Sequence, residues 1–227
     1  VYIYIKEMCW NSNISLNTFV FSTAVLIFIF YNNTYTQYKV SEFNSSLIYL
    51  LFFSYTSMQL VEYFLWNSIK KHNIITNKIF SIIGWILIRI IQPLMILLII
   101  PDKFLSIKKI LFSFYFILLI IVSLYKHYYN PIKFITTVAS DGHLNWKWVK
   151  LNSYEQILFI GYLIILSTLF IKYPMMTIFI ILFFFYSYFK YDTSFGSMWC
   201  WIINSLLLYF IIKILFILPY NEYSKLC

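Results

Sequence analysis

The stretch SSLIYLLFFSYTSMQLVEYFLW, residues 45–66, decides the fold class of this chain. Its length matches the roughly 20 largely apolar residues that an α-helix needs to cross a bilayer. Six further stretches have the same character. The sequence therefore predicts an all-α integral membrane protein with seven transmembrane helices in a single membrane domain, residues 1–227. The predicted spans cover residues 14–31, 45–66, 79–100, 108–125, 154–171, 173–189 and 199–218.

The composition also indicates a membrane protein. Hydrophobic residues make up 62% of the chain and charged residues only 11%, whereas soluble domains are about 25% charged. A soluble core could not bury so much apolar surface. The first apolar run is followed by many others, so it is interpreted as a span and not as a cleaved signal peptide. Because 108–125 and 173–189 are short, six spans are the alternative to seven.

The net charge and the cysteines exclude several classes of protein. The formal charge of +9 comes from 17 Lys and Arg against 8 Asp and Glu, and loop lysines that face anionic lipid headgroups explain it. No nucleic-acid-binding module is visible, so no nucleic-acid partner is expected. Cys9, Cys200 and Cys227 show no CxxC spacing, which argues against a disulfide framework and a zinc finger. The expected partners are the lipid bilayer and a small-molecule, lipid or ion ligand.

The alternation of spans assigns each loop to a side. The N-terminus shares its side with the loops at 67–78, 126–153 and 190–198, and this side carries slightly more lysines. The positive-inside rule therefore places the N-terminus in the cytoplasm. In the long loop, Asp141-Gly142 is a turn signal between two β-forming stretches. We expect a small β-hairpin there, with an irregular re-entrant loop as the alternative.

Residues that carry chemistry gather on the N-terminal side. Cys9 precedes the first span, His143 lies in the long loop, and Cys200 opens the last span. Glu62 lies about one turn inside the second span, where a carboxylate costs a few kcal/mol unless it is paired or hydrated. These four are the candidate catalytic residues. The candidate binding residues are Gln59, Trp66, Arg89, Gln92, Trp146, Trp199 and Asn204.

Each candidate also has a structural interpretation. The tryptophans can be interfacial anchors, the cysteines can be small packing residues, and His143 can be a solvated loop residue. Arg89, near the middle of the third span, can extend toward the N-terminal side and pair with Glu62, either as part of a site or as a tie between helices. Polar residues in the first and last spans, Asn17, Thr18, Ser22, Asn204 and Ser205, predict a polar interior lined by the first, second, third and last spans.

Five motifs in order resemble a family of multi-pass membrane proteins of bacteria and giant viruses. They are MCWN (8–11), SMQLVEYFLW (57–66), IIQPLM (90–95), DGHLNWKW (141–148) and FGSMWCW (195–201). Family members typically begin Met-Cys-Phe-Ser, so the resemblance makes Met8 the expected start and residues 1–7 upstream or added sequence. The aromatic and lysine-rich composition of this chain resembles the giant-virus members more closely, which implies a host or virion membrane.

The resemblance carries functional positions but no established activity. The positions that match the family's motifs are Cys9, Gln59, Glu62, Trp66, Gln92, Pro93, His143, Trp146, Trp199 and Cys200. This chain has Trp10-Asn11 where Phe-Ser is usual, so the positions after Cys9 depart from the pattern.

Several functions compete. Cys9, Glu62, His143 and Cys200 have the ligand types that suit Zn²⁺ or another transition metal, and they could also act as nucleophile and acid or base without metal. The first hypothesis is therefore a membrane-embedded enzyme or a ligand- or metal-binding protein. The alternatives are an ion or proton channel or transporter that uses Glu62 and Arg89, and a non-catalytic viral membrane scaffold. A retinal protein is disfavoured, because Lys213 near a span end is better explained by snorkelling.

Overall fold

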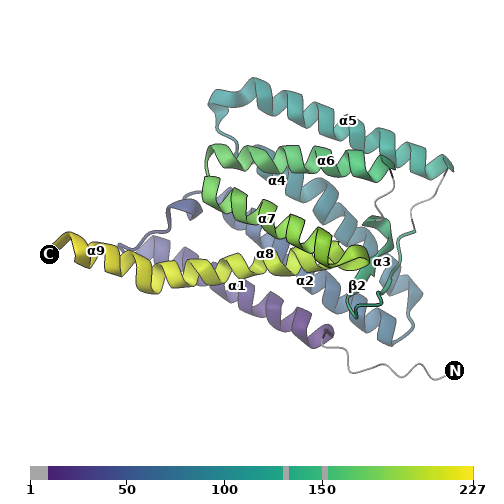
Figure 1. Cartoon of the computed structure of the whole chain (residues 1–227), viewed down its shortest axis with the longest axis horizontal. Helices are drawn as coiled ribbons and strands as arrows, with labels where there is room; N and C mark the ends of the chain where they lie inside the picture. Colours follow the sequence, from purple (N-terminus) through teal and green to yellow (C-terminus); the bar gives the residue numbers. More distant parts are fainter. Residues whose placement is uncertain (1–9, 130–132, 150–152, 227) are drawn as a thin grey trace.

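The computed structural model describes residues 10–129, 133–149 and 153–226. Over these residues the chain runs back and forth in long helical rods that lie side by side, with a small β-hairpin at one end (Figure 1). The expected all-α class and the expected hairpin are confirmed. Four rods are single helices: α1 (Ser12–Tyr35), α2 (Ser46–Lys70), α5 (Leu105–Tyr129) and α7 (Pro174–Lys190). Two rods consist of two α-helices joined by a π-helical turn: α3 (Ile74–Ile86), η2 (Leu87–Ile91) and α4 (Gln92–Ile99) form one, and α8 (Phe195–Ile212), η7 (Lys213–Ile217) and α9 (Leu218–Leu226) form the other. The remaining rod is α6 (Ser153–Ser167), which ends in the 3-10 turn η5 (Thr168–Ile171).

Four of these rods are long and apolar enough to cross a membrane. They are Ser12–Tyr35, Ile74–Ile99, Asp102–Tyr125 and Phe195–Ser224. Gln156–Ile171 and Pro174–Lys190 are apolar but shorter. The protein is therefore a membrane protein by the length and composition of its helices.

The helix α2 differs from these four because it is central and carries more polar residues. It packs against α1, α3, α4 and α8. Its buried residues include Thr56, Gln59 and Glu62. Polar side chains lower the mean hydropathy of a helix, which explains why α2 is not among the four helices that are apolar enough to cross a membrane by composition. The contacts of α2 with other helices bury these polar side chains.

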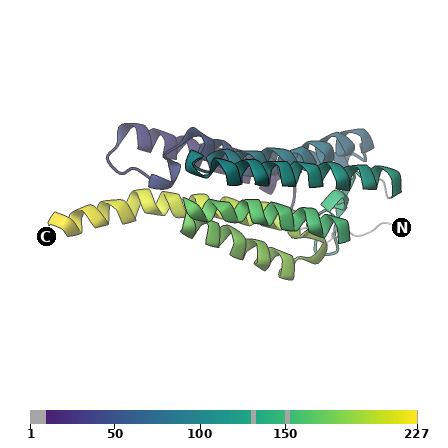
Figure 2. The same cartoon turned by 90° about the horizontal axis from the view of Figure 1, so that it is seen from above.

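The rods form two layers. Turned by 90°, the molecule shows α1 to α5 in one layer and α6 to α9 in the other (Figure 2). Contacts of α1 and α2 with α8, and of α4 and α5 with α6, join the layers. A buried interface with polar side chains lies where α1, α2 and α8 meet.

The helix ends at the hairpin end follow from capping residues. The Asn11 side chain accepts hydrogen bonds from the backbone N–H groups of Asn13 (2.9 Å) and Ile14 (3.2 Å) at the start of α1. Asn73 accepts from the N–H of Thr76 (3.0 Å) at the start of α3. Asn is among the preferred N-cap residues because its side chain satisfies N–H groups that lack a helical partner.

The hairpin consists of β1 (Thr136–Val138) and β2 (Leu144–Trp146), paired antiparallel with Thr136 opposite Trp146. Gly142 has φ +83° in the turn, a left-handed conformation that favours glycine. The helix α3 holds β1, because Asn77 exchanges two hydrogen bonds with the Thr136 backbone (2.8 and 3.0 Å). The hairpin is thus fixed to the helical bundle.

At the opposite end of the bundle, Lys213 pairs with Glu42. The Lys213 Nζ atom lies 2.6 and 2.7 Å from the two carboxylate oxygens, and both side chains are largely buried. Lys213 begins the π-helical turn η7, and Arg89 lies in the π-helical turn η2. Arg89 and Lys213 therefore both lie where the helix is locally widened, a feature that is frequent at functional positions.

Candidate functional site

Polar residues on α1, α2 and α8 share one interface, which we call the polar seam. It consists of Ser15, Thr18 and Ser22 on α1, Thr56, Gln59 and Glu62 on α2, and Ser197, Cys200 and Asn204 on α8. Within each helix these residues are three or four positions apart, so each set lies on one helix face. The three helices contact one another in pairs. The seam therefore begins at the hairpin end and runs inward between them.

Two hydrogen bonds between the helices give the register of the seam. Thr56 Oγ1 donates to Asn204 Oδ1 (3.2 Å), and Trp201 Nε1 donates to Thr18 Oγ1 (3.3 Å). The hydroxyls of Ser15 and Ser197 lie beside the Glu62 carboxylate.

Because α8 is antiparallel to α2 and parallel to α1, these contacts define three successive levels, about one helical turn or 5 Å apart. The levels from the hairpin end inward are Ser15, Glu62 and Ser197, then Thr18, Gln59 and Cys200, then Ser22, Thr56 and Asn204.

The first two levels are buried but incompletely hydrogen-bonded. Ser15, Gln59, Glu62 and Ser197 are each no more than 1% exposed. Neither oxygen of Glu62 and neither polar atom of the Gln59 amide has a hydrogen-bond partner among the described residues; Ser15 and Ser197 approach Glu62 without full hydrogen-bond geometry. An unsatisfied buried polar group costs about 1–3 kcal/mol, and a charged one costs more. Such a cluster calls for an explanation, because most buried polar groups in proteins are hydrogen-bonded.

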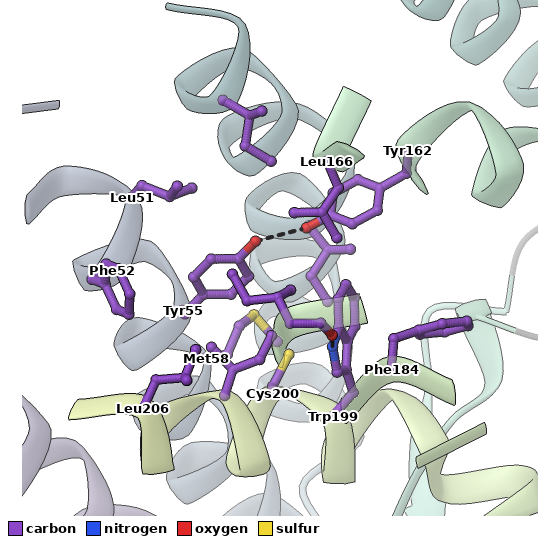
Figure 3. Close-up of a cluster of buried hydrophobic side chains, with 14 of the residues drawn as sticks. Leu51, Phe52, Tyr55, Met58, Tyr162, Leu166, Phe184, Trp199, Cys200 and Leu206 are labelled. Carbon is purple, nitrogen blue, oxygen red and sulfur yellow. Dashed lines mark hydrogen bonds between the residues drawn. The ribbon is translucent and has the colours of Figure 1, made fainter. Parts of the chain in front are cut away.

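Cys200 lies between the seam and a network of tyrosines. Its side chain is fully buried and interacts electrostatically with Glu62 on one side and with Tyr55 and Tyr162 on the other. The Tyr55 and Tyr162 hydroxyls are 3.1 Å apart (Figure 3). The thiol therefore has a carboxylate in its electrostatic surroundings.

The tyrosine network accounts for Arg89 and Gln92. Tyr162 donates to Gln92 Oε1 (3.1 Å), and Tyr115 donates to the Arg89 backbone carbonyl (3.1 Å). The Arg89 guanidinium lies over the ring of Phe159, with 6.0 Å from Cζ to the ring centroid. Arg89 and Gln92 thus belong to contacts among α4, α5 and α6, and not to the seam.

This placement corrects two predictions. The Arg89–Glu62 pair does not form, since the Glu62 oxygens have no hydrogen-bond partner among the described residues. The polar interior is lined by the first, second and last rods, and the third rod faces the tyrosine network instead. Asn17 is exposed and points away from the seam, whereas Ser22 is buried in it. The sequence gives the position of Arg89, Asn17 and Ser22 along each helix, but it does not show which neighbouring helix each side chain faces.

Tryptophans close the seam at the hairpin end. Trp146 packs so tightly on α8 that a Cβ atom added to Gly196 would lie 3.0 Å from its ring, and it stacks on Trp148 with 5.0 Å between ring centroids. Trp10 packs edge-on against Trp201 (4.7 Å) and His143 (5.0 Å). The indole N–H groups of Trp10, Trp66, Trp146 and Trp148 are buried and have no acceptor among the described residues. We call this end of the seam, which is aromatic and rich in hydrogen-bond donors, the entrance.

The hairpin turn is attached to the start of α8 through polar contacts. Asp141 accepts hydrogen bonds from the Ser194 hydroxyl and from the His143 backbone N–H (3.0 Å). The His143 ring packs edge-on against Tyr191, with 5.4 Å between ring centroids. Burial lowers the pKa of His143 below its usual 6.5, while the Asp141 carboxylate acts in the opposite direction. His143 thus belongs to the entrance and not to the seam.

Acidification is expected to loosen the hairpin. Because the His143 pKa is lowered when the hairpin is docked, docking is strongest above pH 6.5 and weakens as the pH falls through that lowered value, since the undocked ring takes up a proton more readily. Tryptophan fluorescence measured from pH 8 to pH 5 should report this change at Trp10 and Trp146. The change should disappear in His143→Phe and persist in His72→Phe, whose histidine is exposed. An unaltered titration in His143→Phe would contradict the prediction.

The remaining predicted site residues within the described part of the chain are buried in the helical bundle. Trp66, one turn from Glu62 on α2, is buried. Trp199 is buried among aromatic rings and donates to the Ile180 carbonyl (3.4 Å), so it packs α8 against α7 (Figure 3). Pro93 is buried at the start of α4. Cys9 and the predicted start at Met8 lie outside the described residues.

The predicted metal site stays a prediction. Among residues 10–129, 133–149 and 153–226, no three His, Cys, Asp or Glu side chains are grouped so that they could hold a metal ion. Of the proposed ligands Cys9, Glu62, His143 and Cys200, the structure brings Glu62 and Cys200 together, and Cys9 is outside the described part. Zinc would need further ligands beyond this pair.

Sequence reasoning missed Ser15; it placed Ser197, Trp10 and Trp148 on the N-terminal side but did not select them as site residues. Ser15 and Ser22 are seven positions apart on α1, and this spacing indicates that the two serines share a helix face. Ser197 and Trp10 flank residues that were selected, but isolated serines and tryptophans near a span end are common.

Comparison with known proteins does not add to this picture, because no family model, curated protein or solved structure matches the chain.

Proposed function

We propose that this protein is a polytopic membrane protein that binds a small polar ligand in the polar seam, with Glu62 at the centre of the site. The observation that supports this proposal is the fully buried Glu62 carboxylate, which has no hydrogen-bond partner among the described residues although Ser15 and Ser197 lie beside it. A carboxylate buried in this way is costly unless a ligand or a proton neutralises it. The ligand enters from the hairpin end, past the tryptophans.

In this proposal all seven rods cross the bilayer, and the hairpin end faces the cytoplasm. The membrane is that of a host or a virion if the resemblance to the giant-virus proteins holds. The large apolar side chains exposed on α5 and α7, such as Ile110, Phe114, Leu182 and Phe185, are then lipid contacts. A scaffold would need such an outer surface, but it would not need unpartnered polar groups inside.

Binding is favoured over conduction because the seam is closed at its inner end. Beyond the level of Thr56 and Asn204, the rings of Phe43, Phe52 and Phe210 pack against one another with centroid separations of 4.9 to 6.0 Å. These three side chains are buried. A channel or transporter would need a path past this aromatic cluster.

An enzymatic form of the proposal assigns Cys200 as nucleophile and Glu62 as its base. His143 would then act at the entrance and not in the chemical step. The ligand-binding form is the simpler one, because it requires only the unpartnered oxygens of the first two levels.

Cysteine accessibility tests the proposal. In protein that lacks its three native cysteines and is held in lipid nanodiscs, Ser197→Cys and Asn204→Cys sample the seam. Ile214→Cys, also buried and on the other side of Phe210, is the matched control. We expect a small water-soluble thiol reagent to modify Ser197→Cys fastest and Asn204→Cys more slowly, and to leave Ile214→Cys intact.

The other outcomes separate the alternatives. Comparable modification of all three variants would indicate a continuous path and favour conduction. A Ser197→Cys variant that reacts no faster than Ile214→Cys would contradict the proposed site.

A further inference from the structure

We propose that the ligand of the polar seam is a small monovalent cation, with Na⁺ as the probe, held by oxygen atoms around Glu62. This inference rests on the proposed function and names the ligand class of the same site. The unpartnered oxygen atoms of the carboxylate, an amide and two hydroxyls carry it. They come from Glu62, Gln59, Ser15 and Ser197.

The donor types favour a hard cation. Carboxylate, amide carbonyl and hydroxyl oxygens are the ligands that hard cations take, whereas thiolates and imidazoles select transition metals. The Gln59 side chain is three residues from Glu62 and on the same face of α2. Ser15 and Ser197 approach the carboxylate from α1 and α8. Three helices therefore direct oxygen atoms toward one region.

The charge of the seam favours a single positive charge. Among its described residues, Glu62 is the one acidic residue, and no basic side chain lies on the three levels. Lys213 is paired with Glu42 at the other end of the bundle, and Arg89 does not pair with Glu62. A monovalent cation leaves the site neutral, whereas a divalent ion would leave a buried net charge, which is costly.

The aromatic entrance is compatible with cation entry. Trp66 and Trp146 are buried near the first level, and the faces of indole rings attract cations. The closed inner end keeps the ion from passing through the bundle. The site is then a one-ended cation pocket that ties α1, α2 and α8 together.

The experiment compares sodium with choline at constant ionic strength. For purified protein in nanodiscs, we expect the unfolding temperature to rise with NaCl relative to choline chloride, and ²²Na⁺ to bind in a scintillation proximity assay. Both effects should be lost in Glu62→Gln and kept in Glu222→Gln, whose carboxylate is exposed. Ser15→Ala and Ser197→Ala should each weaken Na⁺ binding about tenfold, because each removes one oxygen donor to a charged group.

The two serine variants keep the test decisive if Glu62→Gln does not fold. A cation effect that is the same for choline, Na⁺ and K⁺, or a ²²Na⁺ signal that Ser15→Ala and Ser197→Ala leave unaltered, overturns the inference. In that case rapid modification of Ser197→Cys still supports a ligand site, with a proton or an organic ligand on Glu62. Slow modification of Ser197→Cys contradicts the proposed function itself.

Discussion

Trp148→Ala is expected to lower the free energy of unfolding by about 3–5 kcal/mol, the usual cost of removing a large buried aromatic side chain. Trp148 is fully buried. It stacks on Trp146 with an interplanar angle of 8°. Its ring also lies against α3, where a Cβ atom added to Gly84 would be 3.3 Å away. The substitution therefore leaves a cavity between the hairpin and two helices.

The measurement is an SDS or steric-trapping titration in mixed micelles. Trp85→Ala is the matched control, because Trp85 is only partly buried and packs edge-on against Phe134 (6.1 Å). It should cost clearly less than Trp148→Ala. Equal losses in the two variants would mean that the stacked pair does not anchor the hairpin.

Glu62→Met is expected to raise the free energy of unfolding by about 1–3 kcal/mol in a sodium-free buffer. The substitution removes a buried carboxyl group whose oxygens have no hydrogen-bond partner among the described residues and replaces it with an apolar side chain of similar length. Functional sites often store instability of this kind, and their removal stabilises a protein while function is lost.

Glu42, the partner of Lys213 in the connection between α1 and α2, is expected to give the opposite result. Glu42→Met should lower the free energy of unfolding, by about 1–3 kcal/mol, because it leaves the largely buried Lys213 without its partner. The gain in Glu62→Met should also shrink when Na⁺ is added, since bound ligand stabilises only the wild type. Destabilisation in both variants would show that Glu62 is satisfied in the folded protein.

Much of the fold could be predicted from apolar runs and turn signals. The predicted segment 79–100 corresponds to Ile74–Ile99, and 154–171 to Ser153–Ile171. Asp141-Gly142 predicted the hairpin turn, because few residues other than glycine adopt φ +83° easily. The π-helical turns at Arg89 and Lys213 could not be predicted, since they depend on the tertiary contacts of each side chain.

The site could be predicted in part. Glu62, Gln59, Cys200 and Asn204 were found because polar residues are rare in apolar helices and share a face. Arg89 was wrongly assigned to the same interior, because spacing along a helix does not show which neighbour a face meets. Its direction depends on how α3, η2 and α4 pack against α5 and α6, and the sequence of one helix does not contain that information.

The central position of α2 has a consequence for the order of synthesis. Its polar face is covered by α1 on one side and by α8, which is synthesised after α1 to α7, on the other. Until α8 inserts, Thr56 lacks its partner Asn204, and Glu62 lacks the nearby Ser197. A chain that stops after α7 therefore presents an incompletely buried polar helix, the kind of intermediate that is prone to misassembly. The helix α8 thus completes the burial of the polar face of α2.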